Sequence, residues 1–123
     1  MPDPNFLLLY VDSPTESARF YADLLGKPAL EASPTFAMFA LENGVILGLW
    51  SRHTVEPAAA APAGAMEIAF AVADNEAVQS YYSDWGKRGL RVAQTPTDLD
   101  FGHTFVALDP DGHRLRVFAP VAS

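Results

Sequence analysis

Apolar and polar residues alternate in the first half of the chain in a pattern that predicts one helix and four strands. Phe6–Val11 is a continuous apolar run, which predicts a buried strand. Apolar residues at helical spacing then predict a helix that Ser13 can cap and that Gly26 ends. Further strands are predicted at 28–31, 36–41 and 45–50. The first half is therefore a predicted β-α-β-β-β unit.

The second half of the chain repeats this order. Phe70-Ala71-Val72-Ala73-Asp74 matches Leu9-Tyr10-Val11-Asp12-Ser13, and the turn Asp109-Pro110-Asp111-Gly112 matches Glu42-Asn43-Gly44. A helix is predicted at 74–87, and strands are predicted at 66–72, 90–93, 104–108 and 114–118. A repeat of this length indicates a duplicated half-domain, so each position in one half has an equivalent in the other.

The stretch between the two halves differs in composition from both. Residues 52–64 include two prolines and a run of alanines, which is typical of a semi-extended linker. We therefore predict a single domain over 1–123, with a first module at 5–51, a linker at 52–64 and a second module at 65–119. Because such a linker permits exchange of modules between chains, we expect a homodimer with possible module swapping.

Composition and charge narrow the class of protein. The chain has 123 residues, of which half are hydrophobic and 19% are charged, as in an ordinary globular domain. A net charge of −7 without a stripe of Lys and Arg disfavours a nucleic-acid partner. The chain contains no cysteine, and its apolar runs are too short to span a bilayer. We see no signal peptide and expect a cytoplasmic protein without a membrane partner.

The repeated units and their motifs resemble the vicinal oxygen chelate superfamily, which includes glyoxalase I, bleomycin-resistance proteins and extradiol dioxygenases. The resemblance rests on the strand, Ser13, helix and Phe20-Tyr21 block, on its second copy, and on the Asp109-Pro110-Asp111-Gly112 turn. Within that superfamily, the chain is most similar to the phenazine-antibiotic resistance proteins. The segments that carry this narrower similarity are Leu49-Trp50-Ser51, Met66-Glu67-Ile68 and Asp100-Phe101-Gly102-His103-Thr104-Phe105. The resemblance implies an α+β fold of two βαβββ modules, a dimer with cups between modules, and a bound aromatic antibiotic.

Metal-dependent members of that superfamily place ligands at four equivalent positions, two in each half. The resemblance carries these positions onto Phe6, Gly48, Glu67 and Arg116. Phe and Gly side chains offer no lone pair, Arg is cationic, and one carboxylate is too few for a transition-metal site. We therefore predict neither a metal nor another cofactor. Glu67 and Arg116 could form a structural ion pair or could orient a polar edge of a ligand, and the sequence leaves both open.

The ligand site is predicted on the sheet faces that point away from the helices. Gly48 beside Trp50 is expected to leave room for a planar ligand to stack on the indole. His103 flanks a strand expected to line the cup, whereas His53 and His113 are expected in surface or turn positions. The predicted ligand-binding residues are Phe6, Phe36, Met38, Gly48, Trp50, Glu67, His103, Phe105, Arg116 and Phe118. Leu8, Tyr10 and Ile46 point the same way, and for them core packing is favoured.

These features favour a metal-independent protein that sequesters a planar aromatic compound, such as a phenazine-type antibiotic, and that has no catalytic residue. The alternative is a lyase or dioxygenase-type enzyme of the same superfamily. A metal-free enzyme could use Glu67 as a general base, but no nucleophile, base and orienting group occur together in a known motif. A protein-interaction or transcription-linked module ranks third because the chain lacks a basic patch.

Overall fold

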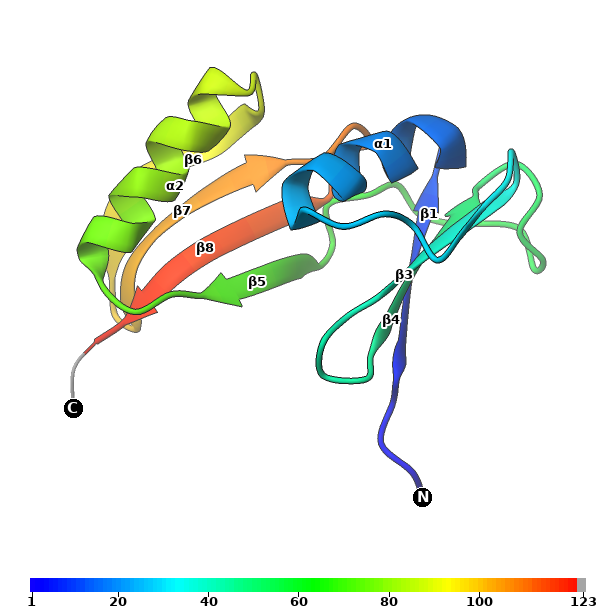
Figure 1. Cartoon of the computed structure of the whole chain (residues 1–123), viewed down its shortest axis with the longest axis horizontal. Coiled ribbons are helices and arrows are strands. Elements are labelled where there is room, and N and C mark those ends of the chain that lie inside the picture. The colour runs from blue at the N-terminus through cyan, green and yellow to red at the C-terminus, as the bar shows by residue number, and fades with distance from the viewer. Residues whose placement is uncertain (122–123) are drawn as a thin grey trace. The chain divides into compact units, whose positions relative to one another are not determined.

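The computed structural model describes residues 1–121 and shows two compact units with a boundary between Pro62 and Ala63. Each unit holds one four-stranded sheet and one helix, and the helix covers one face of the sheet (Figure 1). This arrangement confirms the predicted α+β fold of two βαβββ modules. Neither helix of residues 1–121 is long and apolar enough to cross a membrane.

The first unit follows the predicted order of elements. Its elements are β1 (Phe6–Val11), α1 (Pro14–Leu25), β2 (Glu31–Ala32), β3 (Phe36–Ala40) and β4 (Ile46–Ser51). The sheet order is β1-β4-β3-β2, with β1 parallel to β4 and the remaining pairs antiparallel. The Ser13 hydroxyl accepts a hydrogen bond from the Glu16 amide, and Gly26 ends the helix at a φ of 69°, in the left-handed region that favours glycine.

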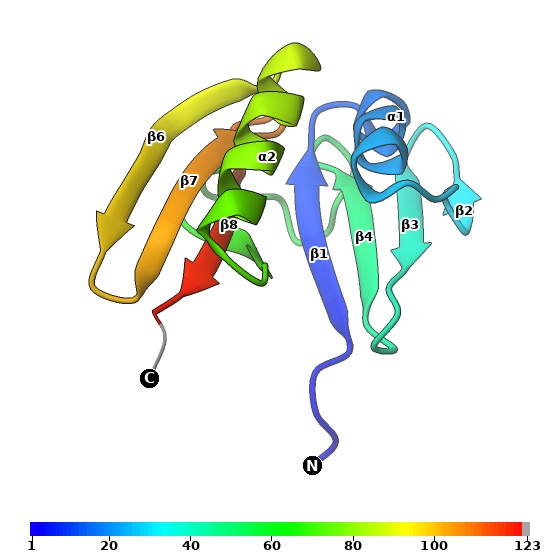
Figure 2. The ribbon, with the colours of Figure 1, turned by 60° about the vertical axis from the view of Figure 1, so that its left-hand side comes forward.

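The second unit has the same topology. Its elements are β5 (Glu67–Ala71), α2 (Asn75–Lys87), β6 (Arg91–Leu99), β7 (Gly102–Leu108) and β8 (Arg114–Pro120). The sheet order is β5-β8-β7-β6, and only the β5–β8 pair is parallel. Asp74 caps α2 by accepting a hydrogen bond from the Ala77 amide at 2.8 Å. Figure 2 shows α2 lying across the sheet strands of its own unit.

Three strands of the second unit are longer than the sequence pattern predicts, and one of them is β8, which ends at Pro120 rather than at Phe118. β6 runs to Leu99 rather than to Ala93, and β7 begins at Gly102 rather than at Thr104. The extra part of β6 contains Pro96, which strands usually exclude. β6 lies at the edge of the sheet and its pairing with β7 is irregular, so a residue without an N–H group is tolerated there.

The core of each unit lies between its sheet and its helix. In the first unit, Tyr21 of α1, Phe39 of β3 and Leu49 of β4 are all fully buried. In the second unit, Trp85 of α2 meets Phe105 of β7 edge to face, with ring centroids 5.4 Å apart. The opposite face of each sheet is not covered by the helix of its own unit. We call these surfaces the first open face and the second open face.

Candidate functional site

Strand register assigns the residues of the first open face. Leu8 and Met38 lie opposite Gly48 on the two sides of β4, and Tyr10 and Phe36 lie opposite Trp50. Side chains on neighbouring strands at paired positions point to the same face of a sheet. The residues of the first open face are Phe6, Leu8, Tyr10, Phe36, Met38, Ile46, Gly48 and Trp50. The expected placement of Phe36 and Met38 on the same face as Trp50 is therefore confirmed.

The first open face is apolar and carries a ring pair. The rings of Phe36 and Trp50 meet edge to face with centroids 6.1 Å apart and an interplanar angle of 87°. Phe6, Leu8 and Tyr10 are each exposed to 40% or more within the described chain. Large apolar residues exposed side by side on one sheet face mark a surface that a ligand or another protein surface covers.

Gly48 serves a different purpose from the one the sequence suggests. A Cβ atom at this position would overlap the Leu8 side chain and would lie 3.3 Å from the Phe36 ring. The glycine therefore admits the side chains of its two neighbours, and the predicted empty space beside Trp50 is filled. A ring that stacks on the indole must lie over Leu8 and Phe36 rather than beside them.

The second open face is built around an ion pair between Glu67 at the start of β5 and Arg116 in β8. Arg116 Nε donates to Glu67 Oε2 at 2.5 Å, and Nη2 donates to Oε1 at 3.3 Å. The Glu67 side chain is 32% exposed and the Arg116 side chain is 14% exposed, so the pair is partly shielded from water. Shielding from water strengthens the attraction between the charges and also raises the cost of leaving either charge unpaired. The structure thus pairs the two residues that the resemblance places at the metal positions of the second half.

Further side chains fix the Arg116 guanidinium. Its Nη1 donates to Thr104 Oγ1 at 3.2 Å and to Gln94 Oε1 at 3.5 Å, and Thr104 Oγ1 in turn donates to the Val117 carbonyl. The guanidinium also lies over the Phe101 ring, 5.6 Å from its centroid. These contacts hold Arg116 in a single orientation.

Aromatic and apolar side chains border this network. Phe101 meets Phe118 edge to face with centroids 5.7 Å apart, so two aromatic rings border the Arg116 guanidinium. A pocket of about 240 Å³ opens on the same face, and its lining residues are Ala93, Gln94, Leu99, Val106, Arg114 and Arg116. The sequence prediction missed Gln94, Phe101, Thr104 and Arg114. Arg114 could have been found from period-two alternation, because it precedes Arg116 by two residues.

Phe105 and His103 do not lie where the sequence prediction expects them. Phe105 is fully buried beneath α2, between Tyr82 and Trp85, and has no surface to offer a ligand. His103 shares that side of β7: its Nδ1 bonds to Asp98 Oδ1 at 2.6 Å and its Nε2 lies 2.9 Å from Gln79 Nε2. Alternation along β7 places Thr104, and not its neighbours, on the open face. Both side chains therefore point to the helix-covered face of the second sheet, and not to the second open face.

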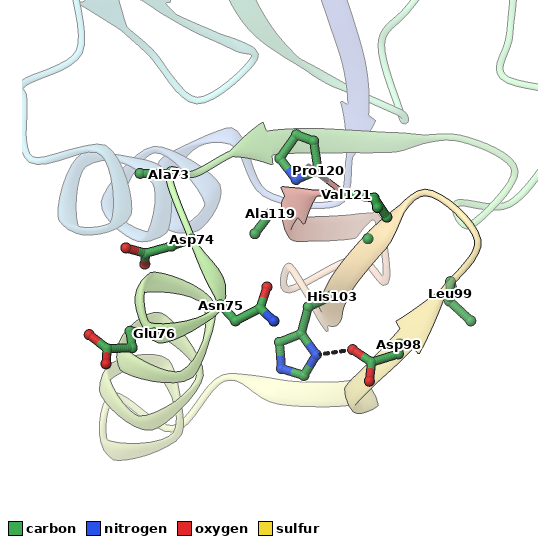
Figure 3. A pocket seen from close by; sticks show the side chains of 11 residues that line it. Ala73, Asp74, Asn75, Glu76, Asp98, Leu99, His103, Ala119, Pro120 and Val121 are labelled. Atoms are coloured by element: carbon green, nitrogen blue, oxygen red, sulfur yellow. Dashed lines mark hydrogen bonds and ion pairs between the residues drawn. The ribbon is translucent and has the colours of Figure 1, made fainter. Parts of the chain in front are cut away.

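His103 instead borders a separate hollow at the start of α2. This pocket, of about 770 Å³, is lined by the first residues of α2, by the β6–β7 hairpin and by the end of β8 (Figure 3). Asp74, Glu76 and Asp98 give it an acidic rim, and the dashed line in Figure 3 marks the bond from His103 to Asp98. Both ring nitrogens of His103 have partners, which is the pattern of a structural histidine.

The residues at the four superfamily metal positions do not fit a metal ion. Phe6 and Gly48 have no donor atom, and the Arg116 guanidinium occupies the Glu67 carboxylate with two hydrogen bonds. Asp109, Asp111 and His113 also gather ligand atoms within 4.8 Å of one another. Asp109, however, accepts hydrogen bonds from the Asp111 amide and from the amide and ring of His113, so its carboxylate organises the β7–β8 turn.

Known proteins resemble this chain over almost its whole length. The sequence profile of the Glyoxalase/Bleomycin resistance protein/Dioxygenase superfamily matches residues 4–117. The phenazine antibiotic resistance protein EhpR of Enterobacter agglomerans is 31% identical over 117 residues, which cover 93% of this chain and 89% of that protein. The solution NMR structure of protein ATC0852 from Agrobacterium tumefaciens is 48% identical, covers 99% of this chain and 100% of that one, and has a TM-score of 0.90. A crystal structure from Nocardioides, described as a glyoxalase/bleomycin resistance protein/dioxygenase, shares the fold at 24% identity and a TM-score of 0.82, over 100% of this chain and 86% of that one.

Proposed function

The chain belongs to the glyoxalase/bleomycin resistance protein/dioxygenase superfamily, and we propose that within it the protein binds a planar aromatic small molecule without a metal. It holds this molecule and does not transform it. The similarity to a phenazine antibiotic resistance protein supports a role in drug resistance, with a phenazine-type compound as ligand. The proposal includes a cytoplasmic location. It also includes a homodimer, and light scattering would measure the mass of the particle in solution.

The observation that carries this proposal is the chemistry at the superfamily metal positions. Two of the four side chains lack donor atoms, and the other two neutralise each other as an ion pair. These four positions therefore cannot hold a metal ion that would polarise a substrate oxygen. Within residues 1–121, neither open face carries another cluster of metal-ligating side chains. Ring surfaces at Phe36 and Trp50 and at Phe101 and Phe118 stand on these faces.

Ring surfaces of this kind support binding by stacking and by apolar burial. Aromatic pairs contribute about 0.5–1.5 kcal/mol beyond the burial of area, and burial adds about 25 cal/mol for each Å² removed from water. A protein that only binds protects in proportion to the bound fraction of the toxic compound. Abundance and affinity then set the protection, and no turnover is required.

The test is a titration with phenazine in a Trp85→Phe background, where Trp50 is the only remaining tryptophan. Quenching of Trp50 fluorescence is expected on binding. The Trp50→Ala variant, followed by calorimetry, is expected to bind phenazine about tenfold more weakly, because the stacking surface is lost. Tyr81→Ala is the control, since it removes an exposed ring from α2 on the covered side of the second sheet.

Three results would contradict the proposal. Unchanged phenazine affinity in Trp50→Ala would rule out the stacking role. Stoichiometric zinc, iron, manganese or nickel in the purified protein would indicate a metal enzyme. Conversion of the bound compound, detected by mass spectrometry of the mixture after incubation, would show that the protein acts on its ligand.

A further inference from the structure

Tyr10 brings a free hydroxyl to the first open face. It lies on β1 directly opposite Trp50 on β4, and it is 42% exposed. Within residues 1–121 the Tyr10 hydroxyl has no hydrogen-bond partner. Apart from this hydroxyl and the Trp50 indole N–H, no side chain of the face carries a nitrogen or oxygen atom. A hydroxyl without a partner in an apolar surface is available to a ligand.

Geometry gives Trp50 and Tyr10 different roles toward a stacked ring. A ligand that stacks on the indole covers the face of the ring, whereas the indole N–H lies in the plane of the ring and points past the ligand. Trp50 therefore offers surface but no hydrogen bond to such a ligand. Because neighbouring strands lie about 4.8 Å apart, the Tyr10 side chain reaches the edge of a ring that covers Trp50.

Burial by a ligand makes the Tyr10 hydroxyl selective. A ligand that covers the face removes water from the hydroxyl, and a buried hydroxyl without a partner costs free energy. A ligand atom that accepts a hydrogen bond avoids this cost. Since the face carries no charged side chain, the acceptor that suits it is neutral, such as a ring nitrogen or a carbonyl oxygen.

The second unit shows that the fold does not require a tyrosine at this position. The pair equivalent to Tyr10 and Trp50 is Ala71 on β5 and Phe118 on β8, which also lie opposite each other. The same sheet register therefore forms without a hydroxyl and without an indole. The polar group beside Trp50 is a property of the first open face and not of the βαβββ module.

We propose that Tyr10 determines specificity by donating a hydrogen bond to a neutral acceptor atom on the edge of the aromatic ligand. It thereby selects heteroaromatic rings over hydrocarbon rings of the same shape. This inference rests on the proposed function and adds a specificity-determining residue to it. All the residues that carry it belong to the first unit.

The experiment compares three uncharged probes of nearly identical shape at pH 7.5, namely phenazine, acridine and anthracene, of which only anthracene lacks a ring nitrogen. Quenching of Trp50 in a Trp85→Phe background reports phenazine and acridine, and anthracene at submicromolar concentration is followed by its own fluorescence. Tyr10→Phe is expected to weaken the binding of phenazine and of acridine about tenfold. The affinity for anthracene should stay unchanged or rise, because anthracene leaves the hydroxyl unpaired.

Two variants control for the hydroxyl and for the ring surface. Tyr81→Phe removes the hydroxyl of another exposed tyrosine, on α2 in the second unit, and should change none of the three affinities. Trp50→Ala should weaken the binding of all three probes, because the stacking surface is lost whichever atoms the ligand edge carries.

The failure of this inference and the failure of the proposed function give different results. Equal losses for phenazine and anthracene in Tyr10→Phe would overturn the inference, because Tyr10 would then act through its ring and not through its hydroxyl. A phenazine or acridine affinity that Tyr10→Phe changes no more than Tyr81→Phe would also overturn it and would leave aromatic binding intact. Absence of binding of all three probes to the wild type would overturn the proposed function itself.

Discussion

The two open faces share a backbone and differ in chemistry. Register makes Gly48 equivalent to Arg116, because each lies opposite the third residue of the first strand of its unit. By the same register, Ile46 is equivalent to Arg114, and Phe6 corresponds to Glu67 as the first residue of its strand. The first open face is therefore apolar where the second is ionic. The βαβββ module provides positions, and the side chains at those positions decide what is bound.

The helix-covered faces of the two sheets show the opposite behaviour. Ala37 in β3 and Phe105 in β7 occupy equivalent positions, and both are fully buried. The side chains at this pair of positions differ in size between the two units, but both are apolar. A position that is fully buried beneath the helix of its own unit stays apolar in both copies, whereas a position on an open face is free to acquire charge.

The largest expected effect tests whether Phe105 belongs to the core. Phe105→Ala should lower the free energy of unfolding by about 3–5 kcal/mol, because it leaves a cavity between Tyr82 and Trp85. Phe6→Ala should lower it by about 1 kcal/mol or less, since Phe6 is 53% exposed. Urea unfolding followed by circular dichroism measures both values.

Substitutions of the two phenylalanines should have the opposite order of effects on phenazine affinity, with the larger effect at Phe6. Phe6→Ala is expected to weaken binding, and the milder variant Phe105→Leu, which stays folded, should bind phenazine as the wild type does. If Phe105→Leu weakens binding while the free energy of unfolding stays unchanged, Phe105 contacts the ligand and the assignment of the two faces is incorrect.

Local signals explain why the sequence predicts the elements so well. Ser13 as a cap, Pro14 in the first turn and Gly26 at the end are each recognisable without tertiary structure, and the first helix has these bounds. β6 shows the limit of such signals, because Pro96 and its polar neighbours read as a loop. Pairing with β7 along the sheet edge extends the strand past them.

The site is less predictable than the fold because a shift of one residue reverses the face of a strand. The sequence shows Thr104 and Phe105 as neighbours in one strand, and only the pairing of β7 with β8 reveals which one points to the helix. The family resemblance points to Glu67 and Arg116, but their ion pair depends on β5 lying beside β8. The contacts with Thr104 and Gln94 depend on two further registers.

The turns that join the last two strands of each unit also differ in chemistry, since only the second turn contains a buried charged side chain. Substitutions in these turns should have the next largest effect on the free energy of unfolding. Asp109 is 1% exposed and accepts hydrogen bonds from the Asp111 amide and from the amide and ring of His113, whereas Asn43 accepts one from the Val45 amide in an exposed turn. Asp109→Ala should lower the free energy of unfolding by about 3 kcal/mol, because buried donors lose their acceptor. Asn43→Ala should have a much smaller effect in the same urea experiment.

The variant Asp109→Asn refines this contrast. It keeps the side-chain volume and one oxygen, so its stability should lie between that of the wild type and that of Asp109→Ala. Equal losses for Asp109→Ala and Asn43→Ala would mean that burial of the carboxylate does not distinguish the two turns.

The smallest expected effect concerns Gly48, where the first open face has no side chain and the second has Arg116. Gly48→Ala should lower the free energy of unfolding by about 1–3 kcal/mol, because its Cβ atom overlaps Leu8. In a Leu8→Ala background the same change should cost less, since the obstructing side chain is gone. A double-mutant cycle measured by urea unfolding gives this coupling directly.

Gly86→Ala is the control for that cycle, because nothing lies within 4 Å of a Cβ atom at this helical position and alanine favours a helix. It should be neutral or stabilising. If Gly48→Ala and Leu8→Ala prove additive, the two side chains do not compete for one space, and the gap beside Trp50 that the sequence predicts would be open to a flat ligand. If the two substitutions couple, Gly48 is required because the Leu8 side chain fills the space above it. The equivalent position in the second half holds Arg116 because only that half has space for a long side chain.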